Sequence, residues 1–437
     1  MGHLTGKEIY HKLGEKIDQM PMRSPWNKTI AALLEKLYSK EESEVVINMP
    51  IVFSTFSELE SCVGVRGKEL KKILEHLTSK GLVMDFYINQ QYYYMPSAMV
   101  VGIYEFTMMR IGDNADEKEI GKLLHRYLIE EESFHEANFG HGEKVSFMRT
   151  LPHEEAVKPD NYVEILDYEK AKYIVENAKK RAISTCACRH AALHANQKKC
   201  DAPLDTCSTF GVAAEYLIRN HMAKEVSCSE MLDIFARSRD MKLVFNADNV
   251  KHNIMFICHC CSCCCHVMTG INQFGYPNSL VTSTFIAQNE LEKCIGCGRC
   301  ADACPVNAVK MVHDKETTLK RKKVPEIDTS LCLGCGVCAL SCPTESIQLD
   351  KRKQKVIHPE TTFERIILQC LEKGTLQHQL FSDPRSKTHQ FMRGFVGGFL
   401  RLDSVKKALM SDLLRSRFLS FMKAGARLQG REWFLKL

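Results

Sequence analysis

The spacing of apolar residues predicts that both ends of the chain are helical. Near the N-terminus, residues 30–37 carry apolar side chains at the three- and four-residue intervals of one helix face. The same periodicity extends over residues 116–137 and 168–180, and it returns in the basic stretch after residue 359. We therefore expect helices to frame the central part of the chain.

A different order of elements follows the first predicted helix. Phe56–Cys62 and Gly67–Lys80 predict two further helices, and Gly81 is well placed to end the second. Segments 82–87 and 91–95 then predict a β-hairpin. Together these elements predict a winged helix over residues 24–100.

The predicted second helix of this module has a basic outer face. A winged helix that binds DNA would contact phosphates there, through Arg66, Lys68, Lys71 and Lys72. No Asn, Gln or Arg on this helix is set to read bases. We therefore expect a protein-docking module and do not expect DNA as a partner.

Cysteine is concentrated in the middle of the chain. Of the 21 cysteines, only Cys62 precedes residue 186 and only Cys370 follows residue 342. Eight of them form two copies of the run C-x2-C-x2-C-x3-C-P, whose spacing is typical of cubane [4Fe–4S] clusters. Zinc prefers paired C-x2-C knuckles, so zinc sites and disulfides are the less favoured interpretations.

The spacing also predicts which cysteines share a cluster. Three thiolates at two-residue gaps can wrap three corners of a cubane, and the fourth of each run reaches across to the other cluster. The glycines between them let the backbone approach the sulfur atoms. One cluster is expected on Cys294, Cys297, Cys300 and Cys342, and the other on Cys332, Cys335, Cys338 and Cys304.

Residues 288–350 resemble a bacterial two-cluster ferredoxin domain. The two complete runs, each ending in Cys-Pro, carry this resemblance. It implies a domain that passes single electrons, because a cubane with four thiolate ligands has no open iron.

Ten of the twelve cysteines upstream of these runs are further candidate ligands. They are Cys186, Cys188, Cys200, Cys207, Cys258, Cys260, Cys261, Cys263, Cys264 and Cys265. The first four are predicted to form one ligand set, and several of the other six a second set. In an extended segment, Cys261, Cys263 and Cys265 would face one way and Cys258, Cys260 and Cys264 largely the other.

Three interpretations of this second group remain open. One or two further iron–sulfur clusters are preferred, because ten crowded thiols exceed the needs of one cubane. A zinc site is the next alternative, since His190, His259 and His266 are available as mixed ligands. Redox-active thiols without a metal are the third.

This second group carries a wider resemblance. The phrase Cys186-Ala-Cys188-Arg-His190, the later Phe256–Cys265 segment and the ferredoxin-like runs are together similar to a family of 4Fe–4S dicluster proteins of anaerobic bacteria and archaea. The resemblance extends over most of the chain. It implies electron transfer in anaerobic metabolism and supplies no particular reaction.

Charge and composition add the expected surroundings. The net charge of +6 is mild, and neither a signal peptide nor an apolar run of membrane-spanning length is apparent, so we expect a cytosolic protein. Arg385–Leu437 holds 12 Lys and Arg against 3 Asp and Glu. This tail is expected to pack on its own core or on a partner, and peripheral contact with an anionic membrane is an alternative.

The sequence thus predicts an α+β protein of several domains. They are a winged-helix-like domain (1–110), a helical linker (111–180), a cysteine-rich domain (181–287), a ferredoxin-like domain (288–350) and a helical tail (351–437). We expect an electron-transfer protein or a subunit of a larger anaerobic oxidoreductase, with a separate redox partner because no nucleotide-binding motif is present. The alternatives are a redox-sensing transcription regulator and an iron–sulfur maturation factor.

Overall fold

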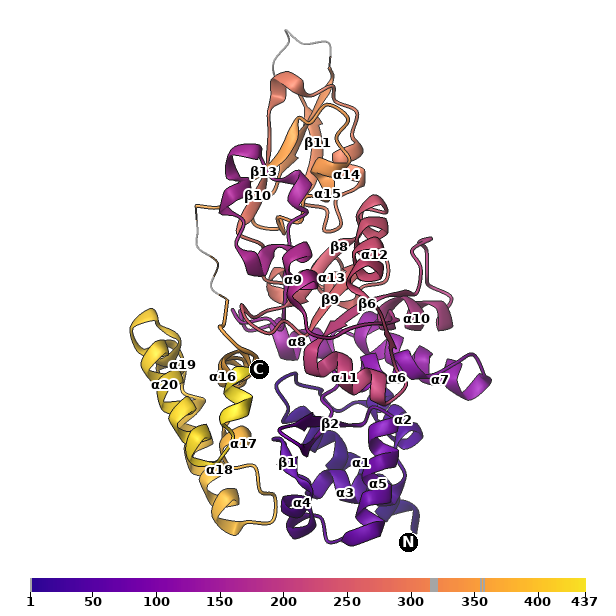
Figure 1. Cartoon of the computed structure of the whole chain (residues 1–437), viewed down its shortest axis with the longest axis vertical. Coiled ribbons are helices and arrows are strands. Elements are labelled where there is room, and N and C mark those ends of the chain that lie inside the picture. Colours follow the sequence, from indigo (N-terminus) through magenta and orange to yellow (C-terminus); the bar gives the residue numbers. More distant parts are fainter. Residues whose placement is uncertain (1, 315–320, 354–355, 357) are drawn as a thin grey trace.

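Helices and small antiparallel sheets alternate along the chain and form a stack of three regions (Figure 1). The computed structural model describes residues 2–314, 321–353, 356 and 358–437. The α-helices are α1 Gly2–Asp18, α2 Lys28–Leu37, α3 Lys40–Asn48, α4 Phe56–Cys62, α5 Gly67–Ser79, α6 Ile103–Arg110, α7 Ala115–His125, α8 Ser133–Phe139, α9 Ala171–Asn177, α10 Ala187–His194, α11 Gly211–Arg219, α12 Cys228–Asp240, α13 His266–Asn272, α14 Arg299–Asp302, α15 Val337–Leu340, α16 Thr362–Glu372, α17 Leu376–Leu380, α18 Lys387–Leu400, α19 Asp403–Met410 and α20 Asp412–Leu428.

Shorter helical turns and thirteen strands complete the described part of the chain. The turns are η1 Arg126–Glu130, η2 Glu154–Ala156, η3 Pro159–Glu164, η4 Asp167–Glu169, η5 Pro277–Ser279, η6 Leu291–Lys293 and η7 Glu432–Lys436. The strands are β1 Ser54–Thr55, β2 Val83–Ile88, β3 Gln91–Pro96, β4 Met148–Thr150, β5 Arg181–Thr185, β6 Asp205–Phe210, β7 Lys224–Glu225, β8 Val244–Asp248, β9 Phe256–Cys260, β10 Phe285–Asn289, β11 Val309–His313, β12 Lys323–Ile327 and β13 Ile347–Lys351.

The N-terminal region contains the helices and the hairpin expected there. Thr55 caps α4 and forms a capping box with Glu58. The hairpin of β2 and β3 turns at Asn89 and Gln90, with φ of 52° and 63°. Positive φ at both central residues suits a type I′ turn, whose twist matches that of the strands. The winged-helix assignment stays a prediction.

The helix predicted over residues 116–137 is interrupted. α7 ends at His125, a π-helical turn follows, and α8 begins only at Ser133. At the break, the Glu131 carboxylate accepts hydrogen bonds from Asn27 Nδ2 at 2.8 Å and Thr29 Oγ1 at 2.6 Å. A tertiary contact therefore fixes a bend that helical periodicity cannot reveal. The helix predicted over 168–180 is also shorter, since α9 ends at Asn177.

The middle region is built on a six-stranded sheet in the order β4-β8-β9-β6-β5-β7, and all neighbouring strands are antiparallel. Because β5 and β9 both run antiparallel to β6, their carboxyl ends lie beside the start of β6. Cys186 follows β5, Cys207 lies on β6, and Cys258 and Cys260 lie on β9. The topology therefore gathers cysteines from distant segments at one end of the sheet.

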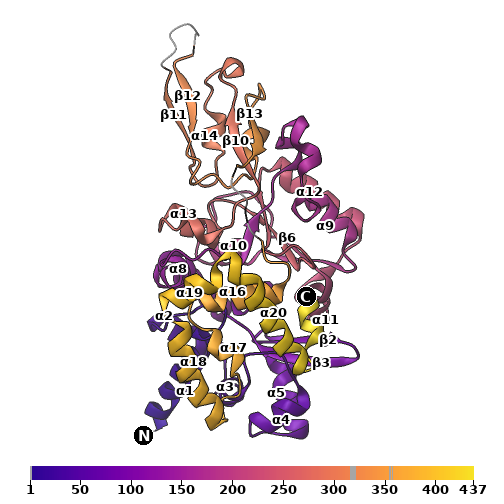
Figure 2. The same cartoon turned by 90° about the vertical axis from the view of Figure 1, so that its left-hand side faces the viewer.

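The third region, at the top of Figure 1, carries two antiparallel strand pairs, β10 with β13 and β11 with β12. The tail lies along the opposite half of the molecule, and Figure 2 shows α18, α19 and α20 crossing the front of the N-terminal and middle regions. Part of the tail packs into its own core, which includes Leu371, Leu400 and Leu419. Phe391, Phe395, Leu413, Phe421 and Leu428 remain exposed. None of the helices in the described ranges combines the length and apolar character that a membrane span requires.

Candidate metal centres

The loops of the two C-x2-C-x2-C-x3-C-P runs have the backbone geometry that sulfur ligation requires. Gly296 and Gly298 of the first run, and Gly334 and Gly336 of the second, all have φ between 69° and 86°. This left-handed conformation favours glycine and points backbone N–H groups toward sulfur. Gly296 N lies 3.4 Å from Cys294 Sγ, an N–H···S contact of that kind.

The fourth cysteine of each run is held in the same way and crosses to the other run. Ala308 N donates to Cys304 Sγ at 3.2 Å, and Ser346 N donates to Cys342 Sγ at 3.3 Å. Cys304 lines one small cavity together with Cys332, Cys335 and Cys338. On the other side, Cys300 interacts electrostatically with Cys294 and Cys342. The sulfurs thus come together in the crossed arrangement that two cubanes need, and the set with Cys304 surrounds a small cavity.

The two ferredoxin-like sets differ in exposure. Cys297 of the first run is exposed, whereas Cys332, Cys335 and Cys338 are buried. Burial raises the pKa of the Cys335 thiol to about 12, and the neighbouring Cys332 and Cys304 sulfurs act in the same direction. As a free thiol this group would be neutral, and the iron of a cluster would supply the positive charge that stabilises the thiolate form.

The buried set is fastened to the middle region. His153 N donates to Cys335 O at 2.9 Å, and Ser283 Oγ donates to Gly334 O at 2.8 Å. The His153 ring lies 4.7 Å from the Phe245 ring, which lies 5.0 Å from the His259 ring. His259 stands between Cys258 and Cys260, so packed aromatic rings connect the two cysteine regions.

Four of the ten upstream cysteines form a tight group, which we call the four-sulfur group. Cys200, Cys261, Cys263 and Cys264 have Sγ atoms that all lie within 4.8 Å of one another. The Sγ atoms of Cys200 and Cys261 are 3.5 Å apart, and those of Cys263 and Cys264 are also 3.5 Å apart. Four thiolates of a tetrahedral site with metal–sulfur bonds of about 2.3 Å would be about 3.8 Å apart.

The remaining six form an extended array, which we call the six-sulfur group. Its thiols interact in the order Cys186, Cys188, Cys265, Cys260, Cys258 and Cys207. A hydrogen bond to the neighbouring thiol, followed by burial, raises the pKa of both Cys186 and Cys258 well above its usual value. Without a metal these two side chains would therefore be neutral thiols, and bound metal would deprotonate them.

A buried arginine joins the three segments that carry these cysteines. Arg189 is 0% exposed; its Nη1 donates to Pro203 O at 2.8 Å and to Thr206 Oγ1 at 2.6 Å, and its Nη2 donates to His259 O. A hydrogen bond from Cys264 holds the pKa of Cys261 well below its usual range, and the positive charge of Arg189 contributes further. Arg189 therefore compensates negative charge where thiolates gather.

The predicted ligand sets need correction. Cys186, Cys188, Cys200 and Cys207 do not form one set: Cys200 joins the 261–264 segment, and the other three join Cys258, Cys260 and Cys265. The extended conformation on which alternation along 258–265 depends is not present throughout, because β9 ends at Cys260 and a turn follows. That turn brings Cys264 to the side of Cys261.

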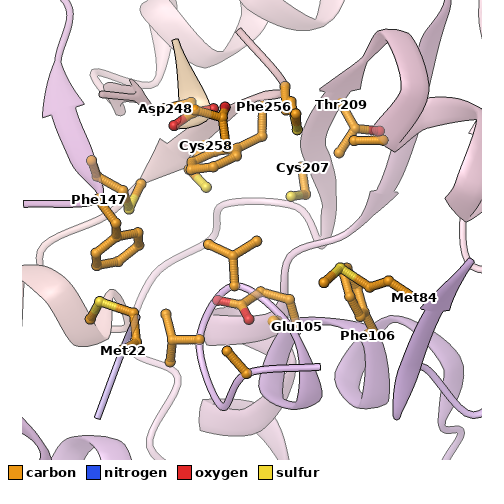
Figure 3. Close-up of a pocket in the computed structure, with 18 of the residues that line it drawn as sticks. Met22, Met84, Glu105, Phe106, Phe147, Cys207, Thr209, Asp248, Phe256 and Cys258 are labelled. Atoms are coloured by element: carbon orange, nitrogen blue, oxygen red, sulfur yellow. The ribbon is translucent and has the colours of Figure 1, made fainter. Parts of the chain in front are cut away.

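An apolar cavity of about 200 Å³ opens beside the six-sulfur group (Figure 3). Its walls include Met22, Phe106, Phe147 and Phe256. Glu105 lies on the wall opposite Cys258 (Figure 3). Burial raises the pKa of Glu105 to about 7, although Gly102 N donates to its Oε2 at 2.9 Å. This carboxyl can hold a proton near neutral pH at the edge of the cavity.

Arg189 and Glu105 were not predicted as site residues. Arg189 directly follows Cys188 in the sequence Cys186-Ala-Cys188-Arg189, and this position beside two cysteines could have indicated a site residue. Glu105 gives no such signal, because it lies more than eighty residues before the first middle-region cysteine. Only the packing of α6 on the sheet brings it to the cavity.

Comparison with known proteins identifies one part of the chain. Residues 293–346 match the family model of the 4Fe–4S dicluster domain. This segment is therefore a ferredoxin-like iron–sulfur domain. No curated protein and no solved structure matches the chain.

Proposed function

We propose that this protein is an electron-transfer component of an oxidoreductase, in which the ferredoxin-like domain exchanges electrons with a cysteine-bound iron–sulfur centre in the middle region. The six-sulfur group beside the apolar cavity is the observation that carries the proposal. Buried thiols are ordinarily separate and inert, whereas six interacting ones next to an iron–sulfur domain suit a further centre.

The position of the ferredoxin-like domain supports a direction for this exchange. Cys297 of its first run lies at the surface, which suits contact with a separate redox protein. Its buried second run adjoins the middle region through His153 and the rings of Phe245 and His259. Electrons would enter at the surface and leave toward the cavity, where Glu105 can supply a proton.

The two upstream sulfur groups are proposed to hold different metals. The six-sulfur group is extended and borders a cavity, as a multi-iron cluster requires. In the four-sulfur group, the Cys263 Sγ to Cys261 Sγ distance of 3.8 Å matches a tetrahedral edge around one ion such as Zn²⁺ or Fe²⁺. A cubane between these four sulfurs would need them further apart.

The N-terminal winged-helix-like module is proposed to serve as a structural cover and not as a DNA reader. Its hairpin is held by the middle region: Arg219 contacts the Asp85 carboxylate at 3.2 Å, and Tyr216 Oη donates to Val83 O at 3.4 Å. This attachment favours electron transfer over the regulator alternative.

Metal analysis of the full-length protein, purified without oxygen, tests the proposal. The wild type should contain about eight irons in the ferredoxin-like domain and about four more in the six-sulfur group. Cys258→Ser should remove the additional irons and their electron paramagnetic resonance signal. Cys261→Ser should remove a single metal equivalent and leave most of the iron in place.

Cys62→Ser is the matched control, because Cys62 lies on α4 outside both sulfur groups. It should keep the full metal content. A wild type with eight irons or fewer, or a Cys258→Ser variant with unchanged iron, would contradict the further centre. Equal iron losses in the Cys258 and Cys261 variants would contradict the division into two kinds of site.

A further inference from the structure

A third cluster of metal-ligating side chains lies at the far end of α10. His190 and His194 are one helical turn apart and face Asp113, in the loop between α6 and α7. One ligand atom from each of the three residues lies within 4.8 Å of the other two. The cluster contains no cysteine and is separate from both sulfur groups.

His194 is a buried imidazole without a hydrogen bond. The residue is 4% exposed, and neither of its ring nitrogens has a hydrogen-bond partner among the described residues. Its Nε2 lies 3.4 Å from Asp113 Oδ1, near enough for both to reach one ion.

His190 is oriented as a metal-binding histidine is. Its Nδ1 lies 2.6 Å from Met108 O, and a carbonyl can only accept, so Nδ1 carries the proton. In the tautomer that this contact selects, Nε2 is the nitrogen that can bind a ligand. Histidines that bind metals commonly donate their other ring N–H in this way.

A glycine on the facing helix makes room for the His194 ring. A Cβ atom added at Gly121 of α7 would lie 2.3 Å from His194 Nδ1. Any other residue at this position would displace the imidazole. His194 can therefore take its position in the cluster only because residue 121 of α7 has no side chain.

We propose that Asp113, His190 and His194 bind one divalent metal ion of the zinc type. Two imidazoles and a carboxylate suit Zn²⁺ and exclude the oxygen-preferring Ca²⁺ and Mg²⁺. The Asp113 side chain is 75% exposed, so the ion can enter from solvent and keep water at its remaining position. The ion ties α10, whose first turn carries Cys188, to the loop before α7.

Zinc content and zinc X-ray absorption of the full-length protein, purified without oxygen, test this site. The wild type should show nitrogen and oxygen ligands at about 2.0–2.1 Å from zinc, distinct from sulfur at about 2.3 Å. Asp113→Ala should remove this nitrogen and oxygen shell and lower zinc by one equivalent per chain. Because Asp113 is exposed, this variant should fold, and its iron content should be unchanged.

Two further variants separate a metal site from a simple histidine–aspartate contact. Gly121→Ala, which displaces the His194 ring, should weaken zinc binding at least about 10-fold, as loss of supporting contacts does at other sites. Asp116→Ala removes another exposed carboxylate on α7 and should keep the zinc. Zinc with sulfur ligands only, or the same nitrogen and oxygen shell in Asp113→Ala, would overturn the proposal.

Discussion

The cysteines of residues 294–342 and those of residues 186–265 are positioned in opposite ways. In the ferredoxin-like domain, three ligands of each set lie within seven residues, and left-handed glycines shape the loop around them. In the middle region, each sulfur group draws on segments that are far apart in sequence. The first arrangement is local, and the second depends on the sheet.

The two regions are therefore sensitive to different kinds of substitution. A metal centre held by one local loop is lost when the backbone of that loop is strained, while the rest of the protein is little affected. A centre assembled from several strands fails when the contacts that join the strands are lost. Changes to one glycine, one arginine and one carboxyl can therefore distinguish the two regions.

The largest effect is expected from Gly334→Ala in the ferredoxin-like domain. Gly334 has φ of +69°, and a Cβ there would lie 2.1 Å from Phe285 O. The loop cannot shift freely, because Ser283 Oγ holds Gly334 O at 2.8 Å. We expect the cluster of Cys332, Cys335, Cys338 and Cys304 to be lost, with a fall of about four irons per chain.

Gly298→Ala is the control for this prediction. Gly298 has φ of +82°, but an added Cβ would meet no atom of the described residues within 4 Å. The Gly298→Ala variant should lose only roughly 1–2 kcal/mol of stability through left-handed strain, and it should keep the cluster of the first run. Equal iron loss in both variants would mean that strain alone, and not the Phe285 contact, decides the outcome.

The same contrast explains how much of the site could be predicted from the sequence. The spacing of Cys294, Cys297 and Cys300 predicts their common cluster, because the ligands and the glycines that shape the loop are neighbours in the chain. Likewise the helix predicted over Phe56–Cys62 has these bounds in the structure, since the Thr55 cap that fixes its start acts within one helical turn. Local chemistry of this kind is visible in the residues themselves.

The remaining features depend on strand order, which no spacing reveals. Cys200 meets Cys261 because β6 pairs with β9, with Ser208 opposite Ile257. Glu105 reaches the cavity only through packing of α6, and Glu131 breaks a regular helical pattern by bonding to Thr29. These are long-range contacts whose partners are more than sixty residues away or on another element.

The next largest effect is expected from Arg189→Met, which keeps the volume of the side chain and removes its charge and hydrogen bonds. Breaking a buried charged contact costs about 3–5 kcal/mol. The thermal unfolding midpoint should fall, and iron should be lost from the middle region while the ferredoxin-like domain keeps its clusters. Anaerobic calorimetry and iron analysis measure both.

Arg239→Met, on α12, is the matched control in the same region. Arg239 pairs with Glu155 at 2.6 Å, but its side chain is 37% exposed. Removing this ion pair should lower the free energy of unfolding by no more than about 1 kcal/mol and leave the iron content unchanged. If Arg189→Met behaves like this control, the middle region does not depend on the joining contacts of Arg189.

The smallest effect is expected from Glu105→Gln in the cavity beside the six-sulfur group, where the change in stability should depend on pH. Burial raises the pKa of Glu105 from 4.5 to about 7 in the folded protein. Below pH 4.5 the carboxyl is protonated in both states and costs nothing; as pH rises toward 7 it ionises first in the unfolded chain, so stability falls. Glutamine cannot ionise and can still accept from Gly102 N, so the variant should be more stable than wild type by up to about 3 kcal/mol at pH 8 and by much less at pH 5.

Unfolding midpoints at the two pH values measure this gain, with Glu292→Gln, an exposed carboxyl beside the first ferredoxin-like run, as the control. A gain for Glu105→Gln that is equal at pH 5 and pH 8 would show that the carboxyl is already ionised in the folded cavity and cannot serve as its proton donor.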